Sequence, residues 1–423
     1  MPRPRPPSRV DTITFPVFGI SWFVSPGDGT SIVAYCGGGG SSKTGIFNKI
    51  VLRKDGDFLS ELSTGDQVCV AIQVYQNPIS GSLWLMGAVG NSVVRYTLPE
   101  GNVSGEADVG DGANAIAVNA MADRLAVGCE SGAIHLFKIS DNRNNFALFG
   151  ICEGHTKAVC ALSFALRGPI LVSSAKDGTA RVWNYETQSS QSTMTCSVED
   201  PKAPPPKRPQ QVLVRGCAFG DLEGNVVFTV ASARRGKAFL YRWTRTEKGT
   251  FECAIRTECS PVPVSAMSLS SDASLLALGG VDGTVTLFDT QTWQVLRKYP
   301  EIHDLPVTCI AARPYAMPFK GEDDDIPMHA ISASADSQLA LLTLLKRAPR
   351  TASSSDGGSA INWMSTFLWA GLLSWVLYYV ALETFQKCEE EWNAHAWGLL
   401  QECFLHTVLI APDSRPGILV PPH

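Results

Sequence analysis

The clearest strand pattern in the chain lies in Gly154–Thr187, which reads GHTKAVCALSFALRGPILVSSAKDGTARVWNYET. Within it the apolar residues alternate with small or polar ones over three short runs, Val159–Phe164, Ile170–Ser174 and Ala180–Asn184. Such alternation is typical of β-strands. Asp177 and Gly178 stand between the second and third runs, where a tight hairpin turn needs residues of this type. The stretch therefore predicts three antiparallel strands joined by short turns.

The same strand spacing recurs along the chain at intervals of roughly 35 to 50 residues. Some units keep the turn residues, such as Asp282-Gly283, and others keep only the spacing of the strands. Seven units are found: Phe15–Leu52, Asp66–Leu98, Ala113–Ile139, Gly154–Thr187, Gln211–Trp243, Val264–Thr292 and His303–Leu344. Repeats of this length that build four-stranded sheets around an axis predict an all-β fold, a seven-bladed β-propeller over residues 11–345.

Four side chains of the first stretch, His155, Ser173, Asp177 and Trp183, have a recognisable arrangement. The unit resembles a WD repeat, and this family places a buried hydrogen-bonding tetrad at these positions. A histidine, a serine and an aspartate together are also compatible with a hydrolase triad. Because blade geometry explains each of the four residues, we expect a structural WD tetrad.

Composition limits the function classes. The 423 residues include 40 acidic and 35 basic side chains, which give a formal net charge of -5. Proteins that bind nucleic-acid backbones usually carry a basic excess, so no nucleic acid is expected as a partner. Charged residues make up only 18% of the chain, below the ordinary share of about 25%. A membrane segment would account for this deficit.

One apolar segment, Ile361–Leu382, reads INWMSTFLWAGLLSWVLYYVAL and carries no charge over its 22 residues. A helix of this length spans about 33 Å, enough to cross a bilayer, whereas a buried core helix is usually shorter. Lys346, Arg347 and Arg350 precede it, and Lys387 follows among several glutamates. Because positive flanks stay in the cytosol, a single-pass type II protein with a cytosolic propeller and a lumenal C-terminus is predicted.

The resulting domain organisation has four segments besides the propeller. Residues 1–10 are expected to be a disordered basic N-terminus, residues 346–360 a linker, residues 361–382 a transmembrane helix and residues 383–423 a lumenal tail. Cys388 and Cys403 would lie in an oxidising compartment, where they form a disulfide, bond to another chain or remain free thiols. The other ten cysteines show no metal-binding spacing and are interpreted as small buried apolar residues.

The first unit departs from the blade pattern at Cys36–Ile50, which reads CGGGGSSKTGIFNKI. Four consecutive glycines allow positive φ angles or a close approach of two backbones. The Ser42-Lys43-Thr44 segment echoes the end of a phosphate-binding P-loop, but Ser42 occupies the place of the second glycine and a strand-like segment follows. Nucleotide binding by this chain is therefore not expected. A loop whose backbone carbonyls face a monovalent cation fits the glycine run.

The motif that carries a specific resemblance lies in Phe15–Ile50. Pro16-Val17-Phe18-Gly19 is followed by an alternating strand, by GGGG and by Gly45-Ile46-x-Asn48-x-Ile50. With the WD repeats and the C-terminal apolar segment, this resembles the endoplasmic-reticulum guanine-nucleotide exchange factors that activate the Sar-type small GTPase of the COPII coat, the prolactin regulatory element-binding protein family. The architecture matches over nearly the whole chain, and the sharp motif covers about a tenth of it.

The resemblance implies a loop in the first blade, termed the K loop, that binds a potassium ion and engages the GTPase. By motif match, the potassium loop comprises Gly37, Gly38, Gly39, Gly40 and Asn48, with backbone carbonyls as ligands. The GTPase-engaging residues by the same match are Gly45, Ile46 and Asn48. Which oxygens hold the ion stays open at this level.

The function implied is guanine-nucleotide exchange on the Sar-type small GTPase at the ER membrane, which starts COPII vesicle coat assembly and ER-to-Golgi transport. Such a protein releases GDP without covalent chemistry, so it is not an enzyme with a small-molecule substrate. The alternative is a membrane-anchored WD-repeat scaffold without exchange activity, because the fold alone does not separate the two.

Overall fold

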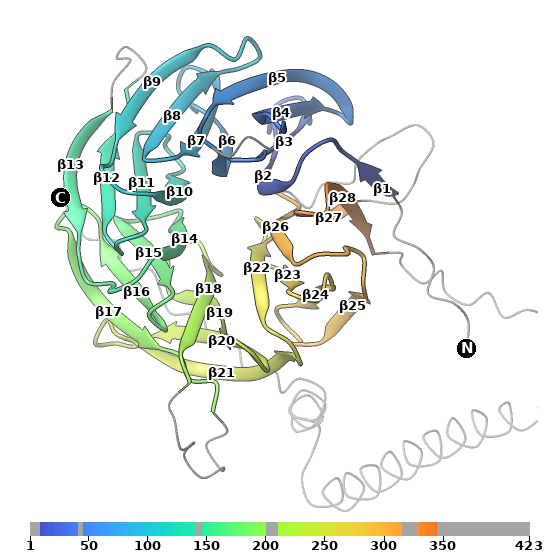
Figure 1. Cartoon of the computed structure of the whole chain (residues 1–423). Coiled ribbons are helices and arrows are strands. Elements are labelled where there is room, and N and C mark those ends of the chain that lie inside the picture. Colours follow the sequence, from blue (N-terminus) through green and yellow to red (C-terminus); the bar gives the residue numbers. More distant parts are fainter. Residues whose placement is uncertain (1–8, 41–44, 141–145, 200–209, 315–327, 345–423) are drawn as a thin grey trace, which may run out of the picture. The chain divides into compact units, whose positions relative to one another are not determined.

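The computed structural model describes residues 9–40, 45–140, 146–199, 210–314 and 328–344. All regular secondary structure within these residues consists of β-strands, and they form seven four-stranded antiparallel sheets. The sheets stand around a common axis as the blades of a propeller (Figure 1). The predicted seven-bladed all-β architecture is confirmed.

Six blades follow one another along the chain, each with its first strand innermost. Blade one contains β2 (Val17–Val24), β3 (Ser31–Gly37), β4 (Asn48–Lys54) and β5 (Asp57–Gly65). Blade two contains β6 (Cys69–Gln76), β7 (Leu83–Val89), β8 (Ser92–Thr97) and β9 (Val103–Asp108). Blade three contains β10 (Ala113–Val118), β11 (Arg124–Cys129), β12 (Ile134–Lys138) and β13 (Ala147–Cys152).

The next three blades repeat this order. Blade four contains β14 (Val159–Phe164), β15 (Ile170–Ala175), β16 (Thr179–Asn184) and β17 (Ser189–Thr195). Blade five contains β18 (Val212–Phe219), β19 (Val226–Ala233), β20 (Ala238–Arg245) and β21 (Phe251–Ser260). Blade six contains β22 (Val264–Leu269), β23 (Leu275–Gly280), β24 (Val285–Asp289) and β25 (Val295–Tyr299).

Blade seven is built from both ends of the propeller. Its strands β26 (Val307–Ala312), β27 (Met328–Ser334) and β28 (Gln338–Thr343) are completed by β1 (Arg9–Thr12), which pairs antiparallel with β28. The expectation that residues 1–10 are disordered is therefore wrong for Arg9 and Val10, and residues 1–8 lie outside the described part. The physical reason is that β28 would otherwise leave a row of unpaired backbone groups at the edge of the sheet.

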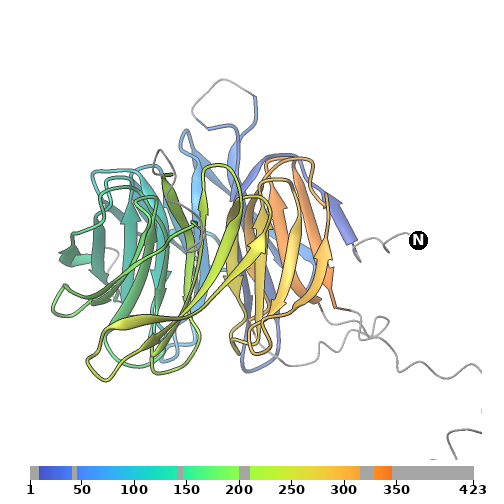
Figure 2. The ribbon, with the colours of Figure 1, turned by 90° about the horizontal axis from the view of Figure 1, so that it is seen from below.

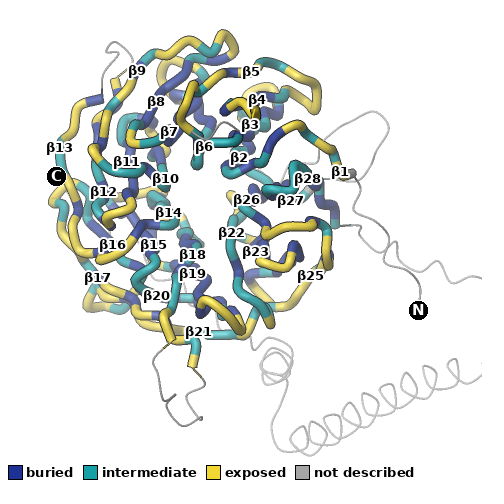
Figure 3. Tube along the Cα trace, viewed as in Figure 1, coloured by how far each residue is buried: buried dark blue, intermediate teal, exposed yellow. Residues whose placement is uncertain are grey.

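Side-chain burial follows the position of a strand within its blade (Figure 3). Every residue of the second strands β15 and β23 is buried, because both faces of these strands pack against neighbouring blades. The outermost strands β21 and β25 are mostly exposed or half-buried, with one buried residue in each. The core is thus a ring of apolar layers between adjacent sheets.

Antiparallel strands place successive connections on alternate faces of the propeller. The connections β3–β4, β5–β6, β7–β8, β9–β10 and β11–β12 share one face, which we term the loop face. The last strand, β28, runs away from this face and ends on the opposite one, which we term the exit face. Figure 2 shows the β3–β4 segment rising at the top and the end of β28 at the bottom.

No helix among the described residues is long and apolar enough to cross a membrane. The predicted linker 346–360, the transmembrane segment 361–382 and the tail 383–423 with Cys388 and Cys403 lie outside the described residues. All ten cysteines in the described part are free thiols, and Cys253 is exposed rather than buried.

Candidate functional site

The glycine run lies where β3 leaves the first blade. Gly37 ends β3 and is squeezed between two strands, because a Cβ atom at this position would lie 1.8 Å from the carbonyl oxygen of Pro16. No other residue type fits that space. The backbone on either side of residues 41–44 then rises above the loop face (Figure 2), and residues 41–44 themselves are outside the described part.

The next glycines provide a backbone path that other residues resist. Gly38 has a φ of 142°, and a Cβ there would lie 2.4 Å from Oδ1 of Asn48 and 2.8 Å from the carbonyl oxygen of Phe47. Gly40 and Gly45 also have positive φ angles, 74° and 76°, with open space around them. Sterics therefore explain the glycines at positions 37 and 38, and backbone conformation explains the glycine at position 40.

Asn48 holds this loop from below. Its side-chain Oδ1 accepts a hydrogen bond from the backbone N–H of Gly40 at 2.9 Å, and its Nδ2 donates to the carbonyl oxygen of Gly40 at 3.0 Å. The same Nδ2 donates to the carbonyl oxygen of Gly65 at 3.1 Å. Asn48 is only 4% exposed. In this structure it positions the loop, whereas the motif match had made it a contact residue for a partner.

Gly45, Ile46 and Phe47 reach solvent, and the side chains of Ile46 and Phe47 are 39% and 83% exposed. They immediately precede β4 and stand on the loop face. An aromatic ring exposed to this extent on a braced loop is typical of an anchor for a protein partner. The motif Gly-Ile-x-Asn does not indicate Phe47, because it treats that position as variable. The large apolar side chain of Phe47 beside a glycine loop was the signal in the sequence that could have identified this candidate contact residue.

A monovalent cation at this loop would depend on backbone oxygens. Among the described residues no group of three or more His, Cys, Asp or Glu side chains is arranged to hold a metal. The glycine run Gly37–Gly40 brings carbonyl groups without side chains, which is the donor type that potassium prefers. Asn48 already uses both ends of its amide within the protein, so its contribution would be to hold those carbonyls in place.

The four residues predicted as a tetrad form one hydrogen-bonded chain in blade four. His155 Nδ1 lies 2.9 Å from Oδ2 of Asp177, and His155 Nε2 lies 2.8 Å from Oγ of Ser173. Trp183 Nε1 donates to the same Oγ at 2.8 Å. The His155 side chain is fully buried and that of Asp177 is 7% exposed. A substrate has no access to these groups, so the geometry suits cross-linking of strands.

Electrostatics keep Asp177 ionised in this chain. Burial opposes ionisation, but hydrogen bonds from His155, Thr179 and the Thr156 backbone outweigh it and lower the pKa of Asp177. Blade seven repeats the arrangement with His303, which lies 3.1 Å from Asp336 and 2.9 Å from Ser332 Oγ. The sequence indicates the aspartate of this second set but not its serine.

Comparison with protein families agrees with these blades. The family "WD domain, G-beta repeat" matches residues 147–184 and 251–289, each an outer strand together with the three inner strands of the next blade. The chain contains WD40 repeats. In WD40 units the sequence repeat is offset from the blade by one strand, which explains why β1 completes blade seven.

Several curated proteins are similar to this WD40 propeller over part of their length. SEC12-like protein 2 from Arabidopsis thaliana is 24% identical over 202 residues, 47% of this chain and 46% of that protein. WD repeat-containing protein 91 homolog from Dictyostelium discoideum is 26% identical over 172 residues, 34% of this chain and 22% of that protein. The matched part of WD repeat and HMG-box DNA-binding protein 1 from Mus musculus is 32% identical over 119 residues, 28% of this chain and 10% of that protein. The chain thus spans less than half of the length of each.

Proposed function

We propose that this protein is a guanine-nucleotide exchange factor for the Sar-type small GTPase of the COPII coat, acting at the ER membrane. The observation that carries the proposal is the glycine loop of blade one, which is braced by Asn48 and presents Ile46 and Phe47 to solvent. The Gly-Ile-x-Asn motif and the 24% identity to a SEC12-like protein support an exchange factor of the Sec12 type.

The proposed reaction needs no nucleophile and no general acid. An exchange factor binds the nucleotide-free GTPase more tightly than the GDP-bound form, and by linkage this difference in binding free energy weakens the binding of GDP. Phe47 would provide the apolar anchor on the partner. Asn48 would keep the loop in one conformation while the loop contacts the nucleotide site of the GTPase. Its three hydrogen bonds connect Gly40 of the loop to the start of β4 and to Gly65 at the end of β5.

Potassium is part of the proposal as a structural ion of the loop. The carbonyl groups of Gly37–Gly40 would hold the ion. Its positive charge would offset the mutual repulsion of the carbonyl oxygens that point toward it. Asn48 fixes Gly40 on both its N–H and its C=O side, so this chain already orders one end of the donor set.

The membrane part of the proposal rests on the sequence. Residues 361–382 would anchor the protein as a single-pass type II chain in the ER membrane, with the propeller in the cytosol. Tethering raises the local concentration of the propeller for a GTPase that binds the same bilayer.

The decisive experiment measures GDP release from the Sar-type GTPase of the same organism, using the full 423-residue chain in lipid nanodiscs. Wild type should accelerate release, and Phe47→Ser should lose most of that acceleration, roughly tenfold or more for a central aromatic anchor. Phe58→Ser is the matched control, because Phe58 is 67% exposed in the same blade but lies at the β4–β5 turn on the exit face.

Two results would contradict the proposal. A wild-type protein that binds the GTPase but leaves GDP release unchanged would be a membrane-anchored WD-repeat scaffold. Equal losses in Phe47→Ser and Phe58→Ser would show that the glycine loop is not the point of contact.

A further inference from the structure

A cavity of about 410 Å³ opens on the loop face between blades two and three. Its walls come from the connections β5–β6, β7–β8, β9–β10 and β11–β12, which all lie on this face. The volume is near the lower end of ligand pockets and is large enough to admit a long side chain.

One short turn of the chain connects the base of the glycine loop to the cavity wall. Asn48 donates to the carbonyl oxygen of Gly65, and the turn that begins at Gly65 leads to Val68 in the cavity wall. The N–H of Gly90, another wall residue, lies 3.4 Å from the carbonyl oxygen of Val68. Phe47 and the cavity both lie on the loop face, so a partner that covers this face would contact both.

The charge of the cavity wall is negative. Asp111 and Glu130 are its two charged residues, and the wall contains no basic side chain. Hydrogen bonds from Ser131 lower the pKa of Asp111, and both carboxylate oxygens are held by backbone N–H groups at 2.7 Å, from Gly112 and Ser131. Glu130 lies against Gly112, and none of the described residues pairs with its carboxylate.

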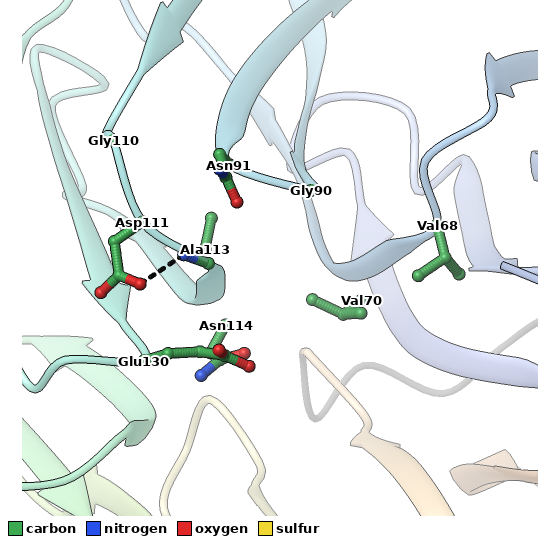
Figure 4. A pocket seen from close by; sticks show the side chains of 10 residues that line it. Val68, Val70, Gly90, Asn91, Gly110, Asp111, Ala113, Asn114 and Glu130 are labelled. Carbon is green, nitrogen blue, oxygen red and sulfur yellow. Dashed lines mark hydrogen bonds between the residues drawn. The ribbon is translucent and has the colours of Figure 1, made fainter. Parts of the chain in front are cut away.

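Two apolar side chains face these carboxylates across the cavity. Figure 4 shows Val68 and Val70 on one side of the cavity and the carboxylates of Asp111 and Glu130 on the other. Lysine and arginine side chains combine an apolar stem with a charged head and bind such mixed surfaces with both parts. An anionic ligand would be repelled here, and a purely apolar one would leave Glu130 desolvated without a partner.

We infer that this cavity receives a lysine or arginine side chain of the partner that binds the glycine loop. The inference rests on the proposed function, in which that partner is the Sar-type GTPase. The stem of the side chain lies along Val68 and Val70, and its head donates to Glu130, while Asp111 contributes charge from its fixed position. Glu130 is then a specificity-determining residue of the interface.

The test uses the full chain in nanodiscs and measures binding of the nucleotide-free GTPase by interferometry. Glu130→Gln removes the charge at nearly constant shape and should weaken binding by roughly fivefold. Its loss of affinity between low and high KCl should also be smaller than that of wild type, since one ion pair is missing. Glu106→Gln is the matched control, because Glu106 is an exposed carboxylate on β9 outside the cavity.

Charge reversal identifies the partner residue. Glu130→Lys should abolish most binding, and one member of a set of single Lys→Glu and Arg→Glu variants of the GTPase should restore it. If Glu130→Gln binds as wild type does, or if Glu106→Gln weakens binding equally, the inference is overturned while exchange by the wild type still supports the proposed function. A wild type that neither binds the GTPase nor accelerates exchange overturns both.

Discussion

Nδ2 of Asn48 donates a 3.1 Å hydrogen bond to the carbonyl oxygen of Gly65, and this contact joins the glycine loop of blade one to the turn that enters blade two. The two residues are the first of β4 and the last of β5. A side chain that its motif predicts to face a partner is thus part of the internal structure of the site.

Replacement of Asn48 by alanine should reduce both stability and exchange. Loss of the amide leaves the Gly65 carbonyl without this donor and releases Gly40, so the free energy of unfolding should fall by about 1–3 kcal/mol. Urea unfolding of the full chain measures the first effect and GDP release the second. Unchanged unfolding together with lost exchange would show that Asn48 contacts the GTPase directly.

Glycine at position 38 should be irreplaceable. In Gly38→Ala the new methyl group would collide with Asn48 and with the Phe47 backbone, so the loop must shift and GDP release should fall at least tenfold. Gly27→Ala is the control, because Gly27 lies in the β2–β3 turn with nothing near its Cβ position. Equal activity of the two variants would mean that the loop conformation is not required.

Potassium should accelerate GDP release by the wild type more than sodium does at equal ionic strength. The reason is that the glycine carbonyls proposed as ligands suit the larger ion. Phe58→Ser should keep this preference, because its side chain lies on the exit face. Equal rates in the two salts would remove the ion from the mechanism and leave the exchange function intact.

Stability should fall as the pH drops below about 6.5, the ordinary pKa of histidine. Burial lowers the pKa of His303, against the opposing effect of Asp336, so the unfolded chain binds a proton that the folded one does not. This proton contributes at most about 1.4 kcal/mol per pH unit. The urea midpoint of wild type should fall more between about pH 7.5 and 5.5 than that of His303→Asn. If the urea midpoints of wild type and His303→Asn fall equally with pH, His303 does not cause the loss of stability.

The ion pair between Arg53 of β4 and Asp11 of β1 should contribute to closure of the propeller. The two groups are 2.8 Å apart, with 25% and 15% of their side chains exposed, and they connect blade one to blade seven. A double-mutant cycle with Arg53→Ala and Asp11→Ala should give a coupling energy of about 1 kcal/mol in urea unfolding. Additive losses would mean that closure depends on strand pairing alone.

The blades were predictable because strand alternation and turn residues are local signals. Asp177-Gly178 and the histidine before the first strand mark a blade regardless of what packs against it. Strand β1 was missed for the opposite reason: the four residues Arg9–Thr12 gain a partner only from β28, at the far end of the propeller. Periodicity in so short a segment carries no information about that pairing.

The candidate site was predicted only in part. The glycine run and Asn48 were recognisable, but the inward orientation of Asn48 depends on Gly65, which lies in another strand. The cavity residues Asp111 and Glu130 belong to turns, where acidic residues are common for conformational reasons. Their position beside Val68 and Val70 arises from the packing of two blades and has no counterpart in the local sequence.

Because β1 pairs with β28, blade seven cannot close during synthesis until β28 has been made. The partner strand of β1 begins at Gln338, about 330 residues later, so at ordinary translation rates β1 remains unpaired for roughly 15 to 65 seconds. A free strand edge invites pairing with other chains. The sequence before β1, MPRPRPPS, contains four prolines and two arginines, residue types that obstruct such pairing through missing N–H donors and positive charge. Until β28 has been synthesised, these residue types would hinder pairing of β1 with other chains.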